Sequence, residues 1–524
     1  GLPYYVGGVI TDENQLTLQT PGSFWDRFRV DMRVRHEVTA IDTEKKIVTV
    51  CGLDTGKTYE ESYDKLILSP GAKPTQPNMP GIDSDKIFTL RTVEDTLKVH
   101  KFISAEKPKT ATVIGGGFIG IEMAENLAEL GLKVSLIEYA DHLLAPLDYD
   151  MASAVHAQME SHGIRLMLNT AVTGFETKEN ITVTKTAGGC DIASDIVLLS
   201  IGVTPDTALA KEAGLELGLK GSILVNDKME TSAQDVYAVG DAVEVRHFVT
   251  GKKALISLAG PANKQGRIAA DNICGGNSVY RGSQGSSVIK VFDMTAASTG
   301  INEAAAKSAE IDYERVVLSP ASHAGYYPGG KLMTMKVVFE KETYRLLGAQ
   351  IVGYEGVDKR IDVLATAIFA GLRATELKDL DLAYAPPYSS AKDPVNMAGF
   401  MIENIEEGIV KQWYLGQLEE LQEKGERGQV TLLDVRTPAE IAFGRIPGFM
   451  NIPLDSLRDH LDELDPAKPI YVICQSGLRS YVACRILAGY GFDAFNFAGG
   501  YRYFQTVVND RALIEAAFPC GADQ

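Results

Sequence analysis

The 524-residue chain lacks the features that mark several classes of protein. It has no apolar run long enough to span a bilayer, since even the stretch 111–123 contains Glu122. Basic residues are outnumbered: 51 lysines and arginines stand against 69 aspartates and glutamates, and the formal net charge is −18. Such an acidic surface attracts neither nucleic acid nor an anionic membrane, so we expect no partner of either kind.

Cysteine and histidine are also scarce. The six cysteines form no CxxC pair and no disulfide-framework spacing, and the eight histidines are scattered. Metal sites need such residues in clusters, so we expect no metal. The cysteine usage favours a cytoplasmic protein of a reducing compartment.

A glycine-rich turn is the first positive signal. The stretch GGGFIG (115–120) fits G-x-G-x-x-G, follows an apolar strand and opens a helical pattern. Glycines there let the backbone approach a pyrophosphate at a helix N-terminus. The next strand ends at Glu138, where a carboxylate binds a ribose 2′-hydroxyl and repels a 2′-phosphate, so NADH is favoured over NADPH; a tight turn without a ligand is the alternative. The predicted nucleotide-binding residues are Gly115, Gly117, Gly120 and Glu138.

A cysteine begins a second loop between a strand and a helix. The stretch CQSGLR (474–479) curls its backbone N–H groups around the Cys474 sulfur at a helix N-terminus, which stabilises a thiolate and an anionic persulfide. Arg479 adds a positive charge for incoming anions. We predict catalytic roles for both residues; a structural cysteine and a phosphatase loop are the alternatives. Cys484 lies among apolar residues and is expected in the core.

The surroundings of this loop resemble a rhodanese domain. Asp434, Arg436 and Glu440 match its D-x-R-x-x-x-E opening, while Arg445 stands where many rhodaneses have histidine. The resemblance implies that Cys474 accepts sulfane sulfur as a persulfide.

Four motifs in order resemble the pyridine nucleotide–disulfide oxidoreductase family. LILSPGAKP (66–74) is similar to its crossover segment, and the NAD unit follows. TSAQDVYAVGD (231–241) looks like its second flavin motif, and LAGPANKQGRIAADNI (258–273) resembles the segment against the isoalloxazine. The resemblance implies bound FAD. The residues that it assigns to the flavin are Gly71, Ala72, Gly240, Asp241, Pro261 and Asn263.

The opening stretch GLPYYVGG narrows the resemblance to one branch, the coenzyme A disulfide reductases. That branch carries Asn-Cys before Gly-Leu-Pro-Tyr-Tyr, which implies that the reductase cysteine directly precedes Gly1 and that the chain is N-terminally truncated. In the branch, two tyrosines of the partner subunit face that cysteine, and the matching positions are Tyr326 and Tyr384. A phenol hydroxyl there can hydrogen-bond a leaving thiolate. Packing at an interface is the alternative.

The expected fold class is α/β: a flavoprotein with two dinucleotide-binding domains, an α+β dimerisation domain and a C-terminal α/β rhodanese domain. The dimerisation domain should contain antiparallel strands and a helix from about Val357 to Ala370, and QLEELQEKGERG (417–428) should be a charged helical connector. The predicted segments are 1–105, lacking its first βαβ unit, and 229–282 for FAD, 106–228 for NAD, 283–405 for dimerisation and 412–524 for rhodanese.

The predicted function follows from these motifs together. We expect a homodimer that binds FAD, oxidises NADH, and reduces coenzyme A disulfide or a persulfide or polysulfide of coenzyme A, with sulfane sulfur carried on Cys474. An NADH oxidase or peroxidase of the same fold is one alternative, and oxygen or peroxide turnover would support it. A non-reducing sulfur-carrier protein is the other, and absence of bound flavin would support it.

Overall fold

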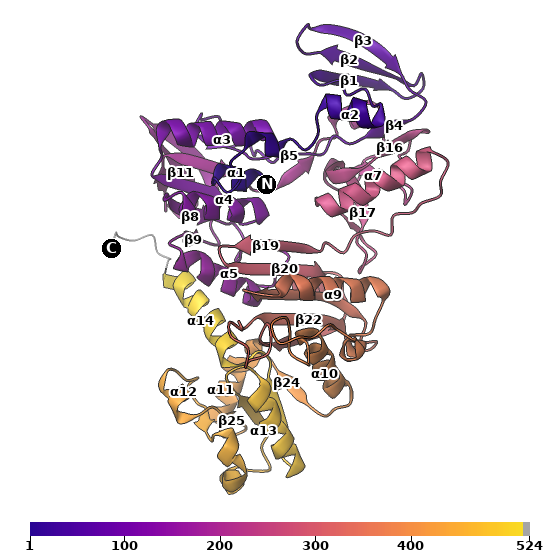
Figure 1. Ribbon diagram of the computed structural model, residues 1–524. Helices are drawn as coiled ribbons and strands as arrows, with labels where there is room; N and C mark the ends of the chain where they lie inside the picture. Colours follow the sequence, from indigo (N-terminus) through magenta and orange to yellow (C-terminus); the bar gives the residue numbers. More distant parts are fainter. Residues whose placement is uncertain (517–524) are drawn as a thin grey trace. The chain divides into compact units, whose positions relative to one another are not determined.

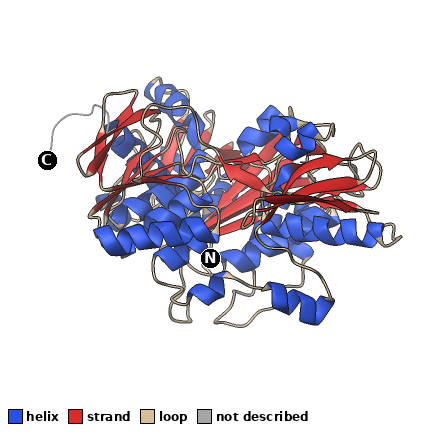
Figure 2. Cartoon of the chain, turned by 90° about the horizontal axis from the view of Figure 1, so that it is seen from above, coloured by secondary structure: helices blue, strands red, loops and turns tan. Residues whose placement is uncertain are grey.

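The computed structural model describes residues 1–516, so Cys520 and the end of the predicted rhodanese segment lie outside the described part. The chain divides into two compact units (Figure 1). The first contains residues 1–141 and 160–285, and the second contains 142–159 and the chain from 286 onward. Both combine helices with strands (Figure 2). Among residues 1–516, no helix has the length and apolarity that a bilayer crossing requires.

A parallel sheet forms the nucleotide-binding part of the first unit. Its order is β6-β13-β7-β8-β9, and every neighbouring pair is parallel. The buried strand β7 is the central strand of this sheet. The glycine turn joins it to α4, which also has a buried apolar face. The elements of this part are α3 (Val93–Glu106), α4 (Phe118–Glu129), β6 (Ile87–Phe88), β7 (Thr110–Ile114), β8 (Lys133–Ile137), β9 (Arg165–Met167), β10 (Val172–Lys178), β11 (Ile181–Thr186), β12 (Ile192–Ser194) and β13 (Ile196–Leu199).

Shorter strands form the rest of the first unit. A three-stranded antiparallel sheet has the order β1-β2-β3. Strand β4 pairs with β16, and β5 pairs with β14. The elements are α1 (Leu2–Val6), α2 (Pro21–Phe28), α6 (Ala208–Glu212), α7 (Ala259–Ile273), β1 (His36–Asp42), β2 (Ile47–Gly52), β3 (Lys57–Ser62), β4 (Leu66–Leu68), β5 (Ala72–Pro74), β14 (Val203–Pro205), β15 (Ile223–Leu224), β16 (Val236–Ala238), β17 (Val243–Arg246) and β18 (Lys253–Ala254).

An antiparallel sheet, β19-β20-β23-β22-β21, is the centre of the second unit. Helix α9 packs on it and has the predicted bounds. Residues 142–159 of the predicted NAD segment group with this unit. The elements are α5 (Tyr149–Ser161), α8 (Glu303–Ser308), α9 (Val357–Ala370), α10 (Pro394–Glu406), β19 (Ser287–Val291), β20 (Met294–Gly300), β21 (Tyr313–Leu318), β22 (Thr334–Glu340) and β23 (Leu346–Gly353).

A parallel sheet, β24-β28-β27-β25-β26, lies in the C-terminal part of the second unit. The helix predicted over 417–428 is α11, and it lies inside the predicted segment 412–524. Its role as a connector is wrong, because its Leu421 is buried in the same core as Trp413 of β24. The elements are α11 (Leu418–Glu426), α12 (Pro438–Ala442), α13 (Leu478–Gly489), α14 (Gly500–Ala516), β24 (Lys411–Trp413), β25 (Thr431–Asp434), β26 (Met450–Asn451), β27 (Ile470–Ile473) and β28 (Ala494–Phe497).

Candidate active sites

The predicted glycine turn opens onto a cavity of about 820 Å³ in the first unit. Gly115 has φ +104°, and a Cβ there would lie 2.4 Å from the carbonyl oxygen of Ser200. A Cβ on Gly120 would lie 1.8 Å from the carbonyl oxygen of Gly115. Larger residues cannot fit at either position, so the backbone stays free to approach a ligand. Gly117, the N-cap of α4, also lines the cavity.

Glu138 lies on the wall of the same cavity, directly after β8. One carboxylate oxygen accepts a hydrogen bond from the N–H of Gly116 at 2.6 Å, and the other accepts from Ala140 at 2.8 Å. These bonds fix the negative charge beside the glycine turn, which is where an adenosine ribose would lie.

Part of the predicted flavin set gathers around an arginine that the sequence did not reveal. Nη2 of Arg91 donates to the carboxylate of Asp241 at 2.6 Å, and a Cβ on Gly71 would lie 3.7 Å from the same nitrogen. Gly240 has φ +81° and donates its N–H to Gln265 at 2.7 Å. Arg91 also lines the cavity, but it stands in no motif, so only the fold could identify it.

The other predicted flavin residues lie in separate elements. Ala72 is buried in β5, and Pro261 is half-buried near the start of α7. The exposed Asn263 donates its amide to the carbonyl oxygen of Ala259 within its own helix at 2.9 Å. It is Leu258, at the N-cap of α7, that lines the cavity.

The structure brings the two predicted tyrosines together in the second unit. The hydroxyls of Tyr326 and Tyr384 lie 2.8 Å apart, although 58 residues separate them in sequence. Both rings are open to solvent, with exposed fractions of 75% and 47%. The hydrogen bond that Tyr384 donates to Tyr326 raises the pKa of Tyr384 above its ordinary value. Two phenol groups are thus presented together at the surface of this unit.

The predicted sulfur-transfer cysteine lies at the bottom of its loop. Cys474 is 0% exposed and follows β27, and Gly477, with φ +96°, turns the chain into α13. The sulfur accepts hydrogen bonds from the N–H of Gly477 at 3.1 Å and from the hydroxyl of Ser480 at 3.2 Å. Two donors and a helix N-terminus all favour the thiolate, which is the nucleophilic form. Ser480 was not predicted.

The arginine of this loop is paired with the motif glutamate. Arg479 donates to both oxygens of Glu440, at 2.7 and 2.5 Å, and this bonding lowers the pKa of Glu440 to about 2. Beneath the loop, Arg436 and Asp434 form a fully buried ion pair at 2.7 Å. Cys484 is buried as predicted, and burial raises the pKa of its thiol.

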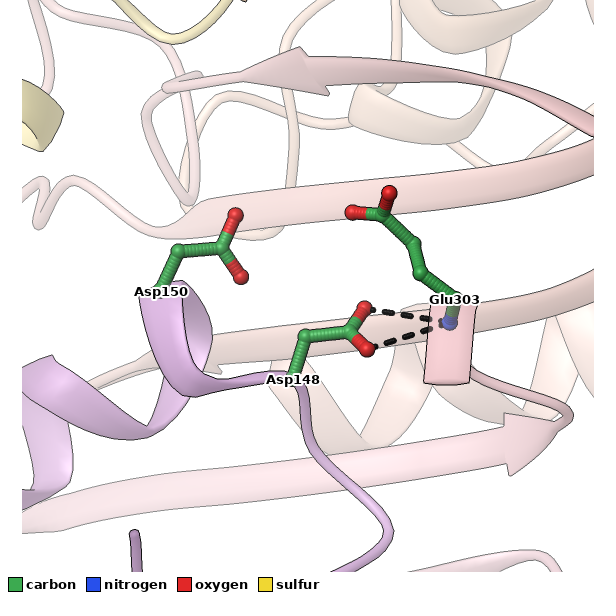
Figure 3. A group of neighbouring side chains, drawn as sticks. All are labelled: Asp148, Asp150 and Glu303. Atoms are coloured by element: carbon green, nitrogen blue, oxygen red, sulfur yellow. Dashed lines mark hydrogen bonds between the residues drawn. The ribbon is translucent and has the colours of Figure 1, made fainter. Parts of the chain in front are cut away.

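An ion cluster in the second unit involves three carboxylates that point toward one another, Asp148, Asp150 and Glu303 (Figure 3). The ammonium of Lys336, which is 0% exposed, lies 3.1, 2.6 and 2.7 Å from them, respectively. Asp150 also accepts a hydrogen bond from the hydroxyl of Tyr503. The lysine therefore supplies the positive charge that such an acidic trio requires.

The chain matches three known domain families. Residues 9–266 match the pyridine nucleotide-disulphide oxidoreductase family, residues 286–394 its dimerisation domain, and residues 417–506 the rhodanese-like domain. Coenzyme A disulfide reductases of Staphylococcus aureus and Staphylococcus haemolyticus are both 36% identical to it, over 400 and 406 residues. The matches cover 76% and 77% of this chain, and 89% and 90% of the relatives.

Solved structures resemble the chain along most of its length. Reduced CoADR-RHD of Bacillus anthracis has a TM-score of 0.95 and 48% identity, covering 98% of this chain and 91% of the other. A NAD-dependent persulfide reductase from A. fulgidus has a TM-score of 0.89 and 37% identity, covering 96% and 92%. A water-forming NADH oxidase from Lactobacillus brevis is less similar, with a TM-score of 0.74, 28% identity, and coverage of 78% and 90%.

Proposed function

The chain belongs to the pyridine nucleotide-disulphide oxidoreductase family and carries a rhodanese domain, and from this premise we propose that it reduces a disulfide or persulfide of coenzyme A with NADH while Cys474 carries sulfane sulfur. The observation that carries the proposal is the geometry of Cys474. Its sulfur is held by two donors at a helix N-terminus, in the same chain as a dinucleotide cavity. The names of the relatives support the same substrate class.

The residues present fit the cofactors of the family, FAD and a nicotinamide nucleotide. The cavity lined by Gly115 and Gly117 at the N-terminus of α4 would hold the pyrophosphate, since backbone without side chains can approach it there. Glu138 favours NADH because its fixed carboxylate accepts from a ribose hydroxyl and repels a 2′-phosphate. Asp241, oriented by Arg91, would accept from a flavin hydroxyl. When bound, the two cofactors supply the two-electron transfer.

Sulfur transfer to Cys474 needs no reactant other than the persulfide donor. The thiolate attacks the terminal sulfur of a persulfide R–S–S–H, so that a new bond forms from Sγ to that sulfur and the donor S–S bond breaks. The donor leaves as the thiolate R–S⁻, and Cys474 becomes a persulfide. The N–H of Gly477 and the hydroxyl of Ser480 stabilise the attacking anion.

Two chains should cooperate in the reductase. The matched dimerisation domain favours a homodimer. Tyr326 and Tyr384 would donate hydrogen bonds to a thiolate that leaves during disulfide or persulfide reduction. Four cysteines of the described part, Cys51, Cys274, Cys474 and Cys484, are free, which suits a cytoplasmic location.

The experiment compares the holoenzyme with Cys474→Ser. NADH oxidation should require coenzyme A disulfide or coenzyme A persulfide, and the variant should retain disulfide reduction while losing the protein-bound persulfide detected by mass spectrometry. NADH oxidation that proceeds equally with dioxygen alone would assign the chain to the oxidases. Full persulfide loading in the variant would remove Cys474 from the mechanism.

A further inference from the structure

A buried arginine connects the two loops that carry the exposed tyrosines. Arg360, on α9, is 1% exposed. Its Nη2 atom donates to the carbonyl oxygen of Ser322, four residues before Tyr326, at 2.9 Å. The same atom donates to the carbonyl oxygen of Tyr388, four residues after Tyr384, at 3.3 Å. One guanidinium therefore holds backbone from both loops.

The charge of this arginine is balanced by Asp393, which is also buried. The carboxylate accepts from Nη2 at 3.0 Å and from Nε at 3.2 Å, and Ser389 donates to it at 2.7 Å. It also caps α10 through the N–H of Val395 at 3.0 Å. Burial raises the pKa of Asp393, but these hydrogen bonds and Arg360 outweigh burial, and the net pKa is lowered. Lys359, 3.7 Å away, adds a second positive charge.

The tyrosine loops have little regular structure to position them. Residues 319–332 and 381–393 contain turns and isolated bridges but no helix or ladder strand. The loops also meet directly, where Ala324 donates its N–H to the carbonyl oxygen of Ser389 at 3.0 Å. Exposed rings on such loops depend on buried contacts for their position.

We propose that Arg360 is the positioning residue for the Tyr326–Tyr384 pair: by holding both loops to Asp393, it sets the 2.8 Å separation of the two hydroxyls. The inference rests on the proposed role of the tyrosines at the reductase centre. Arginine is required because its planar fork contacts a carboxylate and two carbonyls at once, whereas a lysine ammonium keeps the charge but not the geometry.

The first test is the substitution Arg360→Lys, with Arg373→Lys as the matched control. Arg373 lies in the same domain, but it is exposed and pairs with Glu406 at the surface. Tyrosine absorbance is recorded against pH for each protein and for the same protein with the additional substitution Tyr384→Phe. The difference between the two curves gives the titration of Tyr384. In R360K, Tyr384 should ionise at lower pH than in the parent, because the hydrogen bond that it donates to Tyr326, and that raises its pKa, weakens. In R373K its titration should not move.

The second test is a double-mutant cycle on turnover of coenzyme A disulfide by the holoenzyme. R360K should lower kcat by about ten- to a hundredfold with a smaller effect on KM, because misplacing a group by ~1 Å costs that much. In a Tyr326→Phe, Tyr384→Phe background, R360K should lower kcat less than twofold further. An equal loss in both backgrounds, or an unmoved Tyr384 titration, overturns the proposal.

The two readouts separate this proposal from the proposed function. If the phenylalanine substitutions leave kcat unchanged, the tyrosines have no role in the reductase, whereas the titration still decides whether Arg360 positions them. Where R360K fails to fold, Ser389→Ala takes its place. It removes one donor to Asp393 and should shift the Tyr384 titration in the same direction by a smaller amount.

Discussion

Replacing Lys336 with methionine should lower the free energy of unfolding of the second unit by about 3–5 kcal/mol, the usual cost of removing one partner from a buried ion pair. The ammonium is 0% exposed and contacts three carboxylates at 2.6–3.1 Å. Methionine fills nearly the same volume, so packing loss contributes little. The destabilisation would come from the three carboxylates, left close together with Arg315, 3.0 Å from Glu303, as their remaining ion-pair partner.

The pH dependence of this loss has a defined sign. Burial raises the pKa of Asp150, but Lys336, together with Tyr503 and Arg315, outweighs burial and the net pKa is lowered. A carboxyl group of this kind stabilises the fold above its unfolded-state pKa and loses that contribution as the pH falls through its folded-state pKa. In the variant the carboxylates bind protons more readily. The difference in the free energy of unfolding between wild type and variant should therefore be larger at pH 8 than at pH 5.

Urea unfolding followed by tryptophan fluorescence measures the effect. Of the two tryptophans, Trp413 is fully buried in the second unit, whereas Trp25 is 52% exposed and should respond less. The control is Lys341→Met at an exposed position, which should change stability by less than about 0.5 kcal/mol. Mn²⁺ should restore part of the lost stability in K336M and should not stabilise the wild type. The carboxylate oxygens of Asp148, Asp150 and Glu303 lie within 4.8 Å of one another and could bind the ion once the ammonium is gone. If K336M lowers the free energy of unfolding by less than about 1 kcal/mol, the assigned role of Lys336 is refuted.

Three further substitutions test the candidate sites. Ser480→Ala should slow iodoacetamide alkylation of Cys474 at neutral pH by about tenfold, because a hydrogen bond to a charged acceptor is worth about 1.5–3 kcal/mol; an unchanged rate would contradict the role of the hydroxyl. Glu138→Gln should reduce the ratio of kcat/KM for NADH over NADPH by about tenfold, or ~1.4 kcal/mol, and an unaltered ratio would place the ribose elsewhere. Arg91→Met leaves Asp241 without this charged partner and should weaken FAD binding by about tenfold in a flavin-fluorescence titration; wild-type affinity would argue against a flavin contact at Asp241.

Local motifs were sufficient to predict the family and the fold class, which the domain matches and relatives confirm. The glycine turn, the cysteine loop and the helix Val357–Ala370 each depend on residues close together in sequence. Contacts between distant residues could not be predicted in this way. Arg91 and Asp241 are 150 residues apart, and Arg360 and Asp393 are 33 apart, with no motif around either arginine.

The helix predicted at 417–428 is present, but its predicted role as a connector is wrong. Charged residues dominate the stretch and indicated a connector, yet Leu421 packs α11 against the core around Trp413. Strand β3 could not be predicted from apolar alternation, because its residues are almost wholly exposed and its pairing with β2 defines it instead.

The two candidate sites of the second unit are built on the same physical principle. The tyrosine loops are held by Arg360 and Asp393, and the Cys474 loop is held by α14, where Tyr501 donates its N–H to the carbonyl oxygen of Cys474 at 2.7 Å. Further along α14, Asp510 pairs with buried His156 at 3.0 Å. Burying a charged or polar group costs free energy unless the group is paired. These pairs therefore favour one arrangement of the segments that they join. Loops that carry reactive side chains therefore gain a defined position from residues that need not contact substrate.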